Sequence, residues 1–219
     1  MFDFKKIFID LLFPIECLGC RREGKWLCQD CFDKIKINFE SQPYQSENSS
    51  ALNGVWTATD YSQALVAKTL QSFKYNFIVD LGEILGELLV KFLAAKMAEN
   101  SNLSFDVVTA VPLSKKRSLW RGFNQAEILA RQVSKNFGWP IDFGLIRRRH
   151  HNRPQVGLKA AERLANTKGI FEFNQKQLKY KKILLIDDVI TTGATMQECA
   201  KVLKAAGAEE IWGLVIAKG

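Results

Sequence analysis

The N-terminus lacks a hydrophobic run long enough to cross a bilayer. Residues 1–14 are apolar but carry Lys5 and Lys6, and the longest uncharged run there spans only Leu11 to Ile15. A membrane helix needs roughly 20 apolar residues. A small-residue cleavage site is also missing. We therefore expect neither a secretory segment nor a membrane span, and a cytoplasmic location.

Two nucleotide-binding motifs are missing as well. No glycine-rich loop ends in Gly-Lys-Ser or Gly-Lys-Thr, which argues against a P-loop nucleotidase, and no Gly-x-Gly-x-x-Gly follows a strand to form a dinucleotide site. Histidine is scarce, because His150 and His151 are the only two and no acidic partner is close to them in the sequence. We expect both to face solvent instead of binding a metal.

The chain does have enough apolar residues for a full core. Its 219 residues are 47% hydrophobic, which suffices for one α/β domain and a small accessory module. A polar stretch at residues 41–54 indicates a linker between an N-terminal helix with a cysteine module (1–40) and a main domain (55–219). The formal net charge of +8 favours anionic partners, namely phosphorylated small molecules, nucleic acid or acidic lipid.

From Val55 onward, apolar β-branched runs alternate with amphipathic helical stretches. Apolar residues between 81 and 93, and again between 126 and 137, repeat on one helical face, while Cys199 points inward from a later helix as a small core residue. We expect buried strands at residues 106–111, 183–186 and 211–217. This alternation predicts an α/β fold, with a parallel sheet covered by helices on both faces.

Four of the five cysteines form two pairs near the start, Cys17-x-x-Cys20 and Cys28-x-x-Cys31. Pairs with this spacing can surround one tetrahedral Zn²⁺. Disulfides and an iron–sulfur cluster are the alternatives, but nothing in the sequence suggests the oxidising compartment that disulfides need. We expect a structural zinc module, since four thiolate ligands leave no coordination position for a substrate.

The run from Ile186 to Thr195 carries the strongest chemical signal. Asp187 and Asp188 follow a buried strand, whose carboxyl end is where open α/β sheets bind ligands. Gly193 permits a tight turn, so that N–H groups and threonine hydroxyls can surround a phosphate at the start of a helix. The two carboxylates would repel this phosphate unless they face hydrogen-bond donors or a metal, and vicinal ribose hydroxyls with Mg²⁺ nearby meet that requirement. The alternative is a plain turn after two strand-end caps.

This run resembles the phosphoribosyl pyrophosphate signature of type I phosphoribosyltransferases. In that family the acidic pair holds the ribose 2- and 3-hydroxyls, so the resemblance gives Asp187 and Asp188 this catalytic role. It assigns the 5-phosphate to Thr191, Thr192, Gly193, Ala194 and Thr195. Members that act on 6-oxopurines carry an acidic base where this chain has Thr191, which disfavours hypoxanthine or guanine. We assign no general base and no acceptor.

A basic segment, Pro112 to Gly122, follows the strand at residues 106–111 and therefore lies at the same edge of the sheet. We interpret it as a loop whose cations bind pyrophosphate: Lys115, Lys116, Arg117 and Arg121. Fixed cations and Mg²⁺ would stabilise the charge that develops as pyrophosphate leaves ribose C1, which gives Lys115 and Arg117 a catalytic role. The alternative is a solvated charged loop.

A second basic stretch, Arg147 to Gln155, lacks the apolar periodicity of a packed element. We interpret it either as a mobile hood that closes over the substrate or as an arm that contacts nucleic-acid phosphates. The sequence does not separate these two hypotheses.

Together the two halves resemble the ComF family, in which an N-terminal zinc ribbon precedes a phosphoribosyltransferase domain similar to that of amidophosphoribosyltransferase. The resemblance covers nearly the whole chain. It rests on Leu12-Phe13-Pro14, on the distinctive Arg121-Gly122-Phe123-Asn124-Gln125, and on Gln155, Leu158, Arg163, Asn166 and Phe171. Arg21 departs from it, because glycine is expected after Cys20.

The ComF resemblance implies a role in natural competence, that is, in handling incoming single-stranded DNA. Two hypotheses follow. In the first, the chain is a Mg²⁺-dependent phosphoribosyltransferase that uses phosphoribosyl pyrophosphate and an unknown acceptor. In the second, it is a non-catalytic accessory protein that binds phosphoribosyl pyrophosphate and single-stranded DNA alongside the DNA-uptake proteins.

Overall fold

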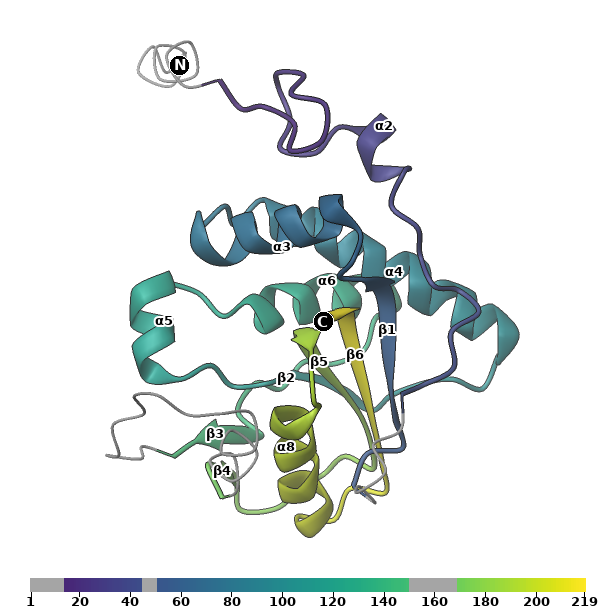
Figure 1. Cartoon of the computed structure of the whole chain (residues 1–219). Coiled ribbons are helices and arrows are strands. Elements are labelled where there is room, and N and C mark those ends of the chain that lie inside the picture. Colours follow the sequence, from purple (N-terminus) through teal and green to yellow (C-terminus); the bar gives the residue numbers. More distant parts are fainter. Residues whose placement is uncertain (1–13, 45–50, 150–168) are drawn as a thin grey trace, which may run out of the picture.

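The computed structural model describes residues 14–44, 51–149 and 169–219 (Figure 1). Its centre is a four-stranded parallel sheet in the order β1-β6-β5-β2, and a parallel bridge between Val108 and Ile141 extends the pairing beyond β2. The strands are β1 (Gly54–Asp60), β2 (Val107–Ala110), β5 (Lys182–Ile190) and β6 (Glu210–Lys218). The predicted parallel sheet is confirmed.

Helices cover both faces of this sheet, as predicted. They are α3 (Ala64–Tyr75), α4 (Leu81–Glu99), α5 (Lys115–Arg121), α6 (Gln125–Phe137) and α8 (Ala194–Ala205), with a short α2 (Gln29–Phe32) before the sheet. The connections from β1 to β2 and from β2 to Ile141 place α3, α4 and α6 on one face of the sheet. The connection from β5 back to β6 runs in the opposite direction and places α8 on the other face. Right-handed crossovers that run in opposite directions have this result.

Strand β5 shows how the sequence builds two core layers. Leu184 and Ile186 pack in the cluster under α4 and α6, whereas Ile183 and Leu185 pack in the cluster under α8, and all four are 0% exposed. Alternate side chains of a strand point to opposite faces, so a strand buried on both sides is apolar throughout. Cys199 is buried in the α8 cluster, which confirms its predicted place in the core.

Two glycines let α4 and α6 approach closely. A Cβ atom on Gly82 would lie 2.4 Å from Cγ2 of Ile128, and one on Gly86 would lie 2.6 Å from Cβ of Gln132. Each pair repeats at a spacing of four residues, so the two helices meet along one row of contacts.

The cysteine segment (residues 14–40) packs on α3 and α4, and Figure 1 shows it in purple above α3. Lys68 donates to the Leu18 carbonyl at 2.7 Å, and Gln63 both accepts from and donates to the backbone of Lys36 at 2.8 Å. Lys91 lies 4.4 Å from the centre of the Phe32 ring. Buried cysteines of this segment therefore share a continuous apolar cluster with the helices.

Three local predictions are wrong. The expected basic loop contains α5, because the Ser114 hydroxyl accepts from the Arg117 N–H at the helix start and Gly122 ends the helix at φ +76°. The second basic stretch begins inside a packed element, since β3 (Ile146–Arg148) pairs antiparallel with β4 (Phe171–Phe173). Strand β5 also continues past Ile186, so the acidic pair lies within the strand.

Several predictions fall on residues that the structure does not describe. These are the N-terminal helix, residues 45–50 of the linker, and the second basic stretch from residue 150 onward, including both histidines. The division of the chain at residues 41–54 stays a prediction. Among the described helices, none combines the length and apolar character that crossing a membrane requires.

We expect Gly86→Ala to lower the free energy of unfolding by up to about 2 kcal/mol. The added methyl group overlaps Gln132 and must push α4 away from α6, a cost of about 1–3 kcal/mol that exceeds the roughly 1 kcal/mol gained in helix propensity. Urea unfolding measures the difference. Glu87→Ala is the matched control, because it changes the next residue on α4 without adding an atom at the contact. A stabilised Gly86→Ala protein would contradict the close approach.

Candidate functional site

The acidic pair lies at the carboxyl end of β5, where the strand still pairs with β6. Asp187 Oδ1 accepts from the Asp188 N–H at 2.8 Å. Asp188 Oδ1 lies 2.9 Å from Nζ of Lys74, with side-chain exposures of 13% and 18%. The two carboxylates therefore belong to consecutive strand residues and are partly buried, and Lys74 of α3 contacts that of Asp188.

Asp187 holds its proton more tightly than an ordinary aspartate. Burial and the neighbouring charge of Asp188 raise the pKa of Asp187 to about 7, although the Asp188 N–H and the charges of Lys74 and Arg117 lower it. The raised pKa shows that the surrounding cations do not fully offset the cost of burying this carboxylate. Such a carboxyl group suits a ligand that brings hydroxyl donors or a divalent cation.

A small pocket follows directly on the acidic pair. Its volume is about 60 Å³, and it is lined by Asp187, Val189, Ile190, Thr191, Thr192, Gly193, Ala194, Thr195 and Met196. Gly193 has φ +76° at the start of α8, and the Ala194 N–H donates to the Thr192 hydroxyl at 3.4 Å. The first N–H groups of a helix have no acceptor within it, and the dipole of α8 adds a positive potential there. This arrangement suits a small anion such as phosphate.

Lys74 is a site residue that the sequence reasoning missed. It is the penultimate residue of α3, more than a hundred positions before its partner Asp188. A basic residue in the last turn of a helix is common, so its sequence context carries no signal of this contact. Only the packing of α3 above the sheet brings it to the carboxylate.

The predicted cations of α5 lie unequally close to the pocket. The charge of Arg117 acts on Asp187, which places it near the acidic pair. Lys115 and Lys116 are exposed on α5 and are not among the pocket-lining residues. Arg121 is partly buried, and its Nη1 donates to Oε1 of Gln125 at 2.8 Å.

The Arg121-to-Gln125 run forms the joint between α5 and α6. Gly122 ends α5, and the Asn124 side chain caps α6 while donating to the Val111 carbonyl at the end of β2. Within the described part of the chain, Nε of Arg121 and Nε2 of Gln125 are buried without a hydrogen-bond acceptor. Buried donors normally have partners, so these two fit a ligand that supplies oxygen atoms. Gln125 is thus a second site residue that the sequence reasoning did not assign.

The described part of the second basic stretch is largely engaged within the protein. Arg147 and Arg149 both form ion pairs with Glu172. Arg148 lies 5.5 Å from the centre of the Phe171 ring, and burial, with Arg117 nearby, lowers its pKa. These three arginines therefore have partners in the hairpin and are not a free arm.

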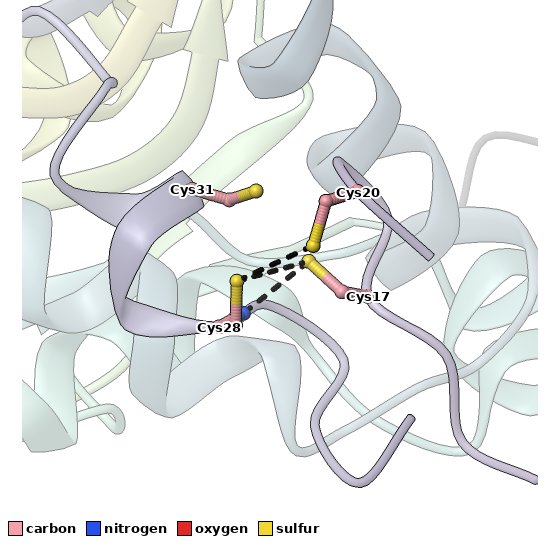
Figure 2. Close-up of side chains that lie close together, drawn as sticks. All are labelled: Cys17, Cys20, Cys28 and Cys31. Carbon is pink, nitrogen blue, oxygen red and sulfur yellow. Dashed lines mark hydrogen bonds between the residues drawn. The ribbon is translucent and has the colours of Figure 1, made fainter. Parts of the chain in front are cut away.

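The four N-terminal cysteines converge, as Figure 2 shows. Their sulfur atoms all lie within 4.8 Å of one another, and Cys28 Sγ lies 3.6 Å from Sγ of both Cys17 and Cys20. A tetrahedral zinc–thiolate site has sulfur atoms about 3.8 Å apart, whereas a disulfide bond is about 2 Å long. The arrangement fits a four-coordinate metal, and all five cysteines of the chain are free of disulfides.

The cysteine knuckles are shaped for this cluster. Burial raises the pKa of Cys17, but the N–H groups of Cys28, Cys20 and Gly19 together outweigh it and lower the pKa to about 6. Burial and the neighbouring cysteines raise the pKa of Cys31. A Cβ atom on Gly19 would lie 2.6 Å from Cys31 Sγ. Arg21 has φ +63°, which explains why glycine is the expected residue there.

We expect the stability advantage of Asp187→Asn over the wild type to grow as pH rises. The pKa of Asp187 is raised in the folded chain, so its ionisation destabilises the fold increasingly from pH 4 to about 7 and by a constant amount above. Asparagine does not titrate and keeps an oxygen for the Asp188 N–H. Between pH 5 and pH 8 the advantage should grow by about 1–2 kcal/mol in urea unfolding. The exposed Asp80→Asn is the control, and equal behaviour of the two variants would contradict the raised pKa.

Comparison with known proteins agrees with this geometry. The family model for the phosphoribosyl transferase domain matches residues 82–218, which include the acidic pair and the pocket. Competence protein F of Haemophilus influenzae is 35% identical over 206 residues, covering 90% of this chain and 89% of that protein.

Two further relatives are similar over shorter lengths. DNA utilization protein YhgH of Escherichia coli is 29% identical, covering 72% of this chain and 70% of its own. Competence protein ComFC of Bacillus subtilis is 39% identical over 101 residues, covering 46% of this chain and 39% of its own. On these matches, the chain belongs to the ComF family and contains a type I phosphoribosyltransferase domain.

Proposed function

We propose that this chain binds phosphoribosyl pyrophosphate and transfers its phosphoribosyl group to an acceptor. One observation carries the proposal: two adjacent, partly buried carboxylates stand beside an anion pocket at the start of α8. A carboxylate pair next to a phosphate site needs a ligand with both hydroxyl donors and phosphate, and a ribose 5-phosphate has both.

The ribose end of the ligand occupies β5 and α8 in this proposal. Asp187 and Asp188 accept from the 2- and 3-hydroxyls, and the segment from Thr191 to Thr195 holds the 5-phosphate. Lys74 orients the Asp188 carboxylate, which its 2.9 Å contact supports. The raised pKa of Asp187 is relieved once a hydroxyl or a cation takes the place of its proton.

The pyrophosphate end faces α5. Arg117 lies near the acidic pair, and the buried donors of Arg121 and Gln125 lack acceptors among the described residues. Lys115 and Lys116 add exposed positive charge on the same helix. Mg²⁺, when bound, offsets the negative charge of the leaving pyrophosphate.

The reaction breaks the bond between ribose C1 and the pyrophosphate oxygen, and pyrophosphate leaves with the electron pair. A nucleophilic atom of the acceptor forms the new bond to C1 and loses its proton. The α5 cations stabilise the developing charge of the leaving group, and the carboxylates lie on the ribose side, where positive charge develops. We assign no residue as the base and no acceptor.

The names of the relatives support a role in DNA handling during natural competence. One relative is named for competence and another for DNA utilization, and this chain covers 89% and 70% of their lengths. We therefore extend the proposal to a cytoplasmic protein of the DNA-uptake process.

We also propose that the four cysteines bind one structural Zn²⁺. The spacing of the sulfur atoms supports a tetrahedral site, and the buried positions of three of the cysteines support a role in the fold. Cys20 is exposed, but four thiolates fill the coordination sphere and leave no position for a substrate.

Replacing both aspartates should abolish ligand binding. Hydrogen bonds to charged groups contribute about 1.5–3 kcal/mol each, so Asp187→Ala with Asp188→Ala should weaken phosphoribosyl pyrophosphate binding by at least about 100-fold. Isothermal titration calorimetry with Mg²⁺ present measures this. The matched control is Glu209→Ala with Glu210→Ala, another adjacent acidic pair, at the opposite end of the sheet.

Equal binding by wild type and by the Asp187 and Asp188 double variant would overturn the ligand assignment. Transfer needs a separate measurement, which is pyrophosphate release across a broad set of acceptors. Wild-type binding without release from any acceptor would sink the transferase half of the proposal and favour the non-catalytic hypothesis.

The purified chain should contain one zinc ion, and Cys28→Ser should lose it. The loss is expected because this change removes one of the four thiolate ligands, whose Sγ lies 3.6 Å from those of Cys17 and Cys20. Gly19→Ala should also weaken zinc binding while keeping all four cysteines, because the added methyl group overlaps Cys31 Sγ. Elemental analysis gives the metal content, and thermal unfolding gives the accompanying loss of stability.

Cys199→Ala is the control for the zinc measurement, since Cys199 is buried in a different cluster and should keep the metal. Iron with inorganic sulfide would contradict the zinc assignment. So would cysteines of the unfolded chain that resist alkylation in the presence of a chelator until a reductant is added.

A further inference from the structure

An exposed group of aromatic side chains lies beside the acidic pair and takes no part in the proposed transfer. We define the aromatic patch as Tyr75, Phe77, Val79, Leu119 and Trp120, which are 40–77% exposed. The ring centres of Tyr75 and Trp120 are 6.2 Å apart, and those of Phe77 and Trp120 are 5.0 Å apart. Contiguous exposed apolar groups of this kind mark interaction sites.

The patch is joined to the phosphoribosyl site through neighbouring residues. Tyr75 directly follows Lys74, whose Nζ contacts Asp188, and the Arg121 guanidinium lies 5.5 Å from the Tyr75 ring centre and 6.0 Å from that of Trp120. Arg121 belongs to the α5–α6 joint, so its guanidinium connects this joint to two rings of the patch.

Helix α5 is built to present its side chains outward. None of its residues is buried, although it carries a tryptophan and a leucine. Phe77 has φ +57°, a backbone conformation that a bulky side chain rarely adopts and that costs free energy. The exposed rings thus do not contribute to a core, and one of them is held at an energetic cost.

Positive charge lies on the α5 side of the patch. Lys115, Lys116 and Arg117 precede the Trp120 ring on α5, and no ion pair within the described part of the chain involves them. By contrast, Arg147 and Arg149 of the hairpin are paired with Glu172. Open aromatic rings next to unpaired cations match a polyanion that also carries flat rings, which is single-stranded nucleic acid. A bilayer surface fits less well, because three consecutive cations interrupt any continuous apolar face on this short helix.

We propose that the aromatic patch is a stacking platform for the bases of single-stranded nucleic acid, with the α5 cations contacting the flanking phosphates. This extends the proposed role in DNA handling, because it names the surface and the part of the nucleic acid that is recognised. Trp120 is the central ring, since it contacts both of the other rings.

The test compares two oligonucleotides with equal numbers of phosphates, a short oligothymidylate and its abasic counterpart. Fluorescence anisotropy of labelled strands measures their affinities for the full chain. Because the abasic strand lacks stacking contacts, the wild type should bind oligothymidylate at least about 10-fold more tightly than the abasic strand. Trp120→Leu should lose this preference while binding the abasic strand as the wild type does. Trp120→Phe should keep most of the preference, because it retains a ring.

Leu119→Ala is the matched control, because Leu119 is the most exposed residue of the patch at 77% yet has no aromatic ring. It should leave the preference unchanged. Lys116→Ala should weaken both strands equally and reduce the dependence of affinity on salt, as a phosphate contact does. Equal affinity of the wild type for both strands would overturn the proposal. The proposal would also be overturned if Trp120→Leu changed only the self-association of the chain or its binding to anionic vesicles.

The failure of this inference can be told apart from that of the phosphoribosyl site. Trp120→Leu should bind phosphoribosyl pyrophosphate as the wild type does, and the Asp187 and Asp188 double variant should keep its preference for bases. Thermal unfolding shows whether Trp120→Leu still folds. If it does not, the Trp120→Phe and Leu119→Ala variants decide whether the bases stack on the patch. Loss of the preference in Leu119→Ala would contradict stacking.

Discussion

The ion pair between Lys74 and Asp188 connects most of the features of this molecule. Helix α3 supplies the lysine, and the same helix contacts the cysteine segment through Lys68 near its middle. Its last residue, Tyr75, belongs to the aromatic patch. The helix thus joins the cysteine cluster, the carboxylates and the patch. Because the pair is partly buried, moving α3 away would leave each charge without its partner. The ion pair therefore favours the observed position of α3.

The site contains electrostatic costs that a ligand can relieve. Asp187 is a carboxylate whose burial and neighbour oppose its ionisation, while two donors at the α5–α6 joint are buried without acceptors. Both are unfavourable in the free protein, and they are opposite in kind, since one needs donors and the other needs acceptors. A sugar with phosphates at two positions supplies both at once. Such a site lowers the stability of the free protein, and the rest of the fold compensates for this. In return, the site is selective for a ligand that supplies both kinds of partner.

Much of this architecture was predictable from the sequence because the signals are local. The apolar run ending at Asp187 and Asp188, the glycine at 193 and the two Cys-x-x-Cys pairs each determine backbone geometry or chemistry within a few residues. The burial of both faces of β5 follows from the same apolar run. The type I phosphoribosyltransferase fold and the cysteine cluster could therefore be predicted before any contact was known.

What the sequence did not reveal depends on contacts between distant segments or on weak local preferences. Lys74 lacks any local pattern that would mark it as the partner of Asp188. Helix α5 is short and bears consecutive charges, so its periodicity is uninformative, yet a serine cap and a left-handed glycine suffice to form it. The pairing of β3 with β4, and the ion pairs of Arg147 and Arg149 with Glu172, join segments more than twenty residues apart.

The absence of buried side chains on α5 has a consequence for motion. A helix without a fully buried residue loses few packing contacts when it moves, so the cost of displacing α5 is set mainly by its two ends. The Ser114 cap and the Gly122–Asn124 joint are the contacts that fix these two ends. A displacement of α5 therefore leaves the two core layers of the sheet undisturbed, because no residue of α5 belongs to either layer.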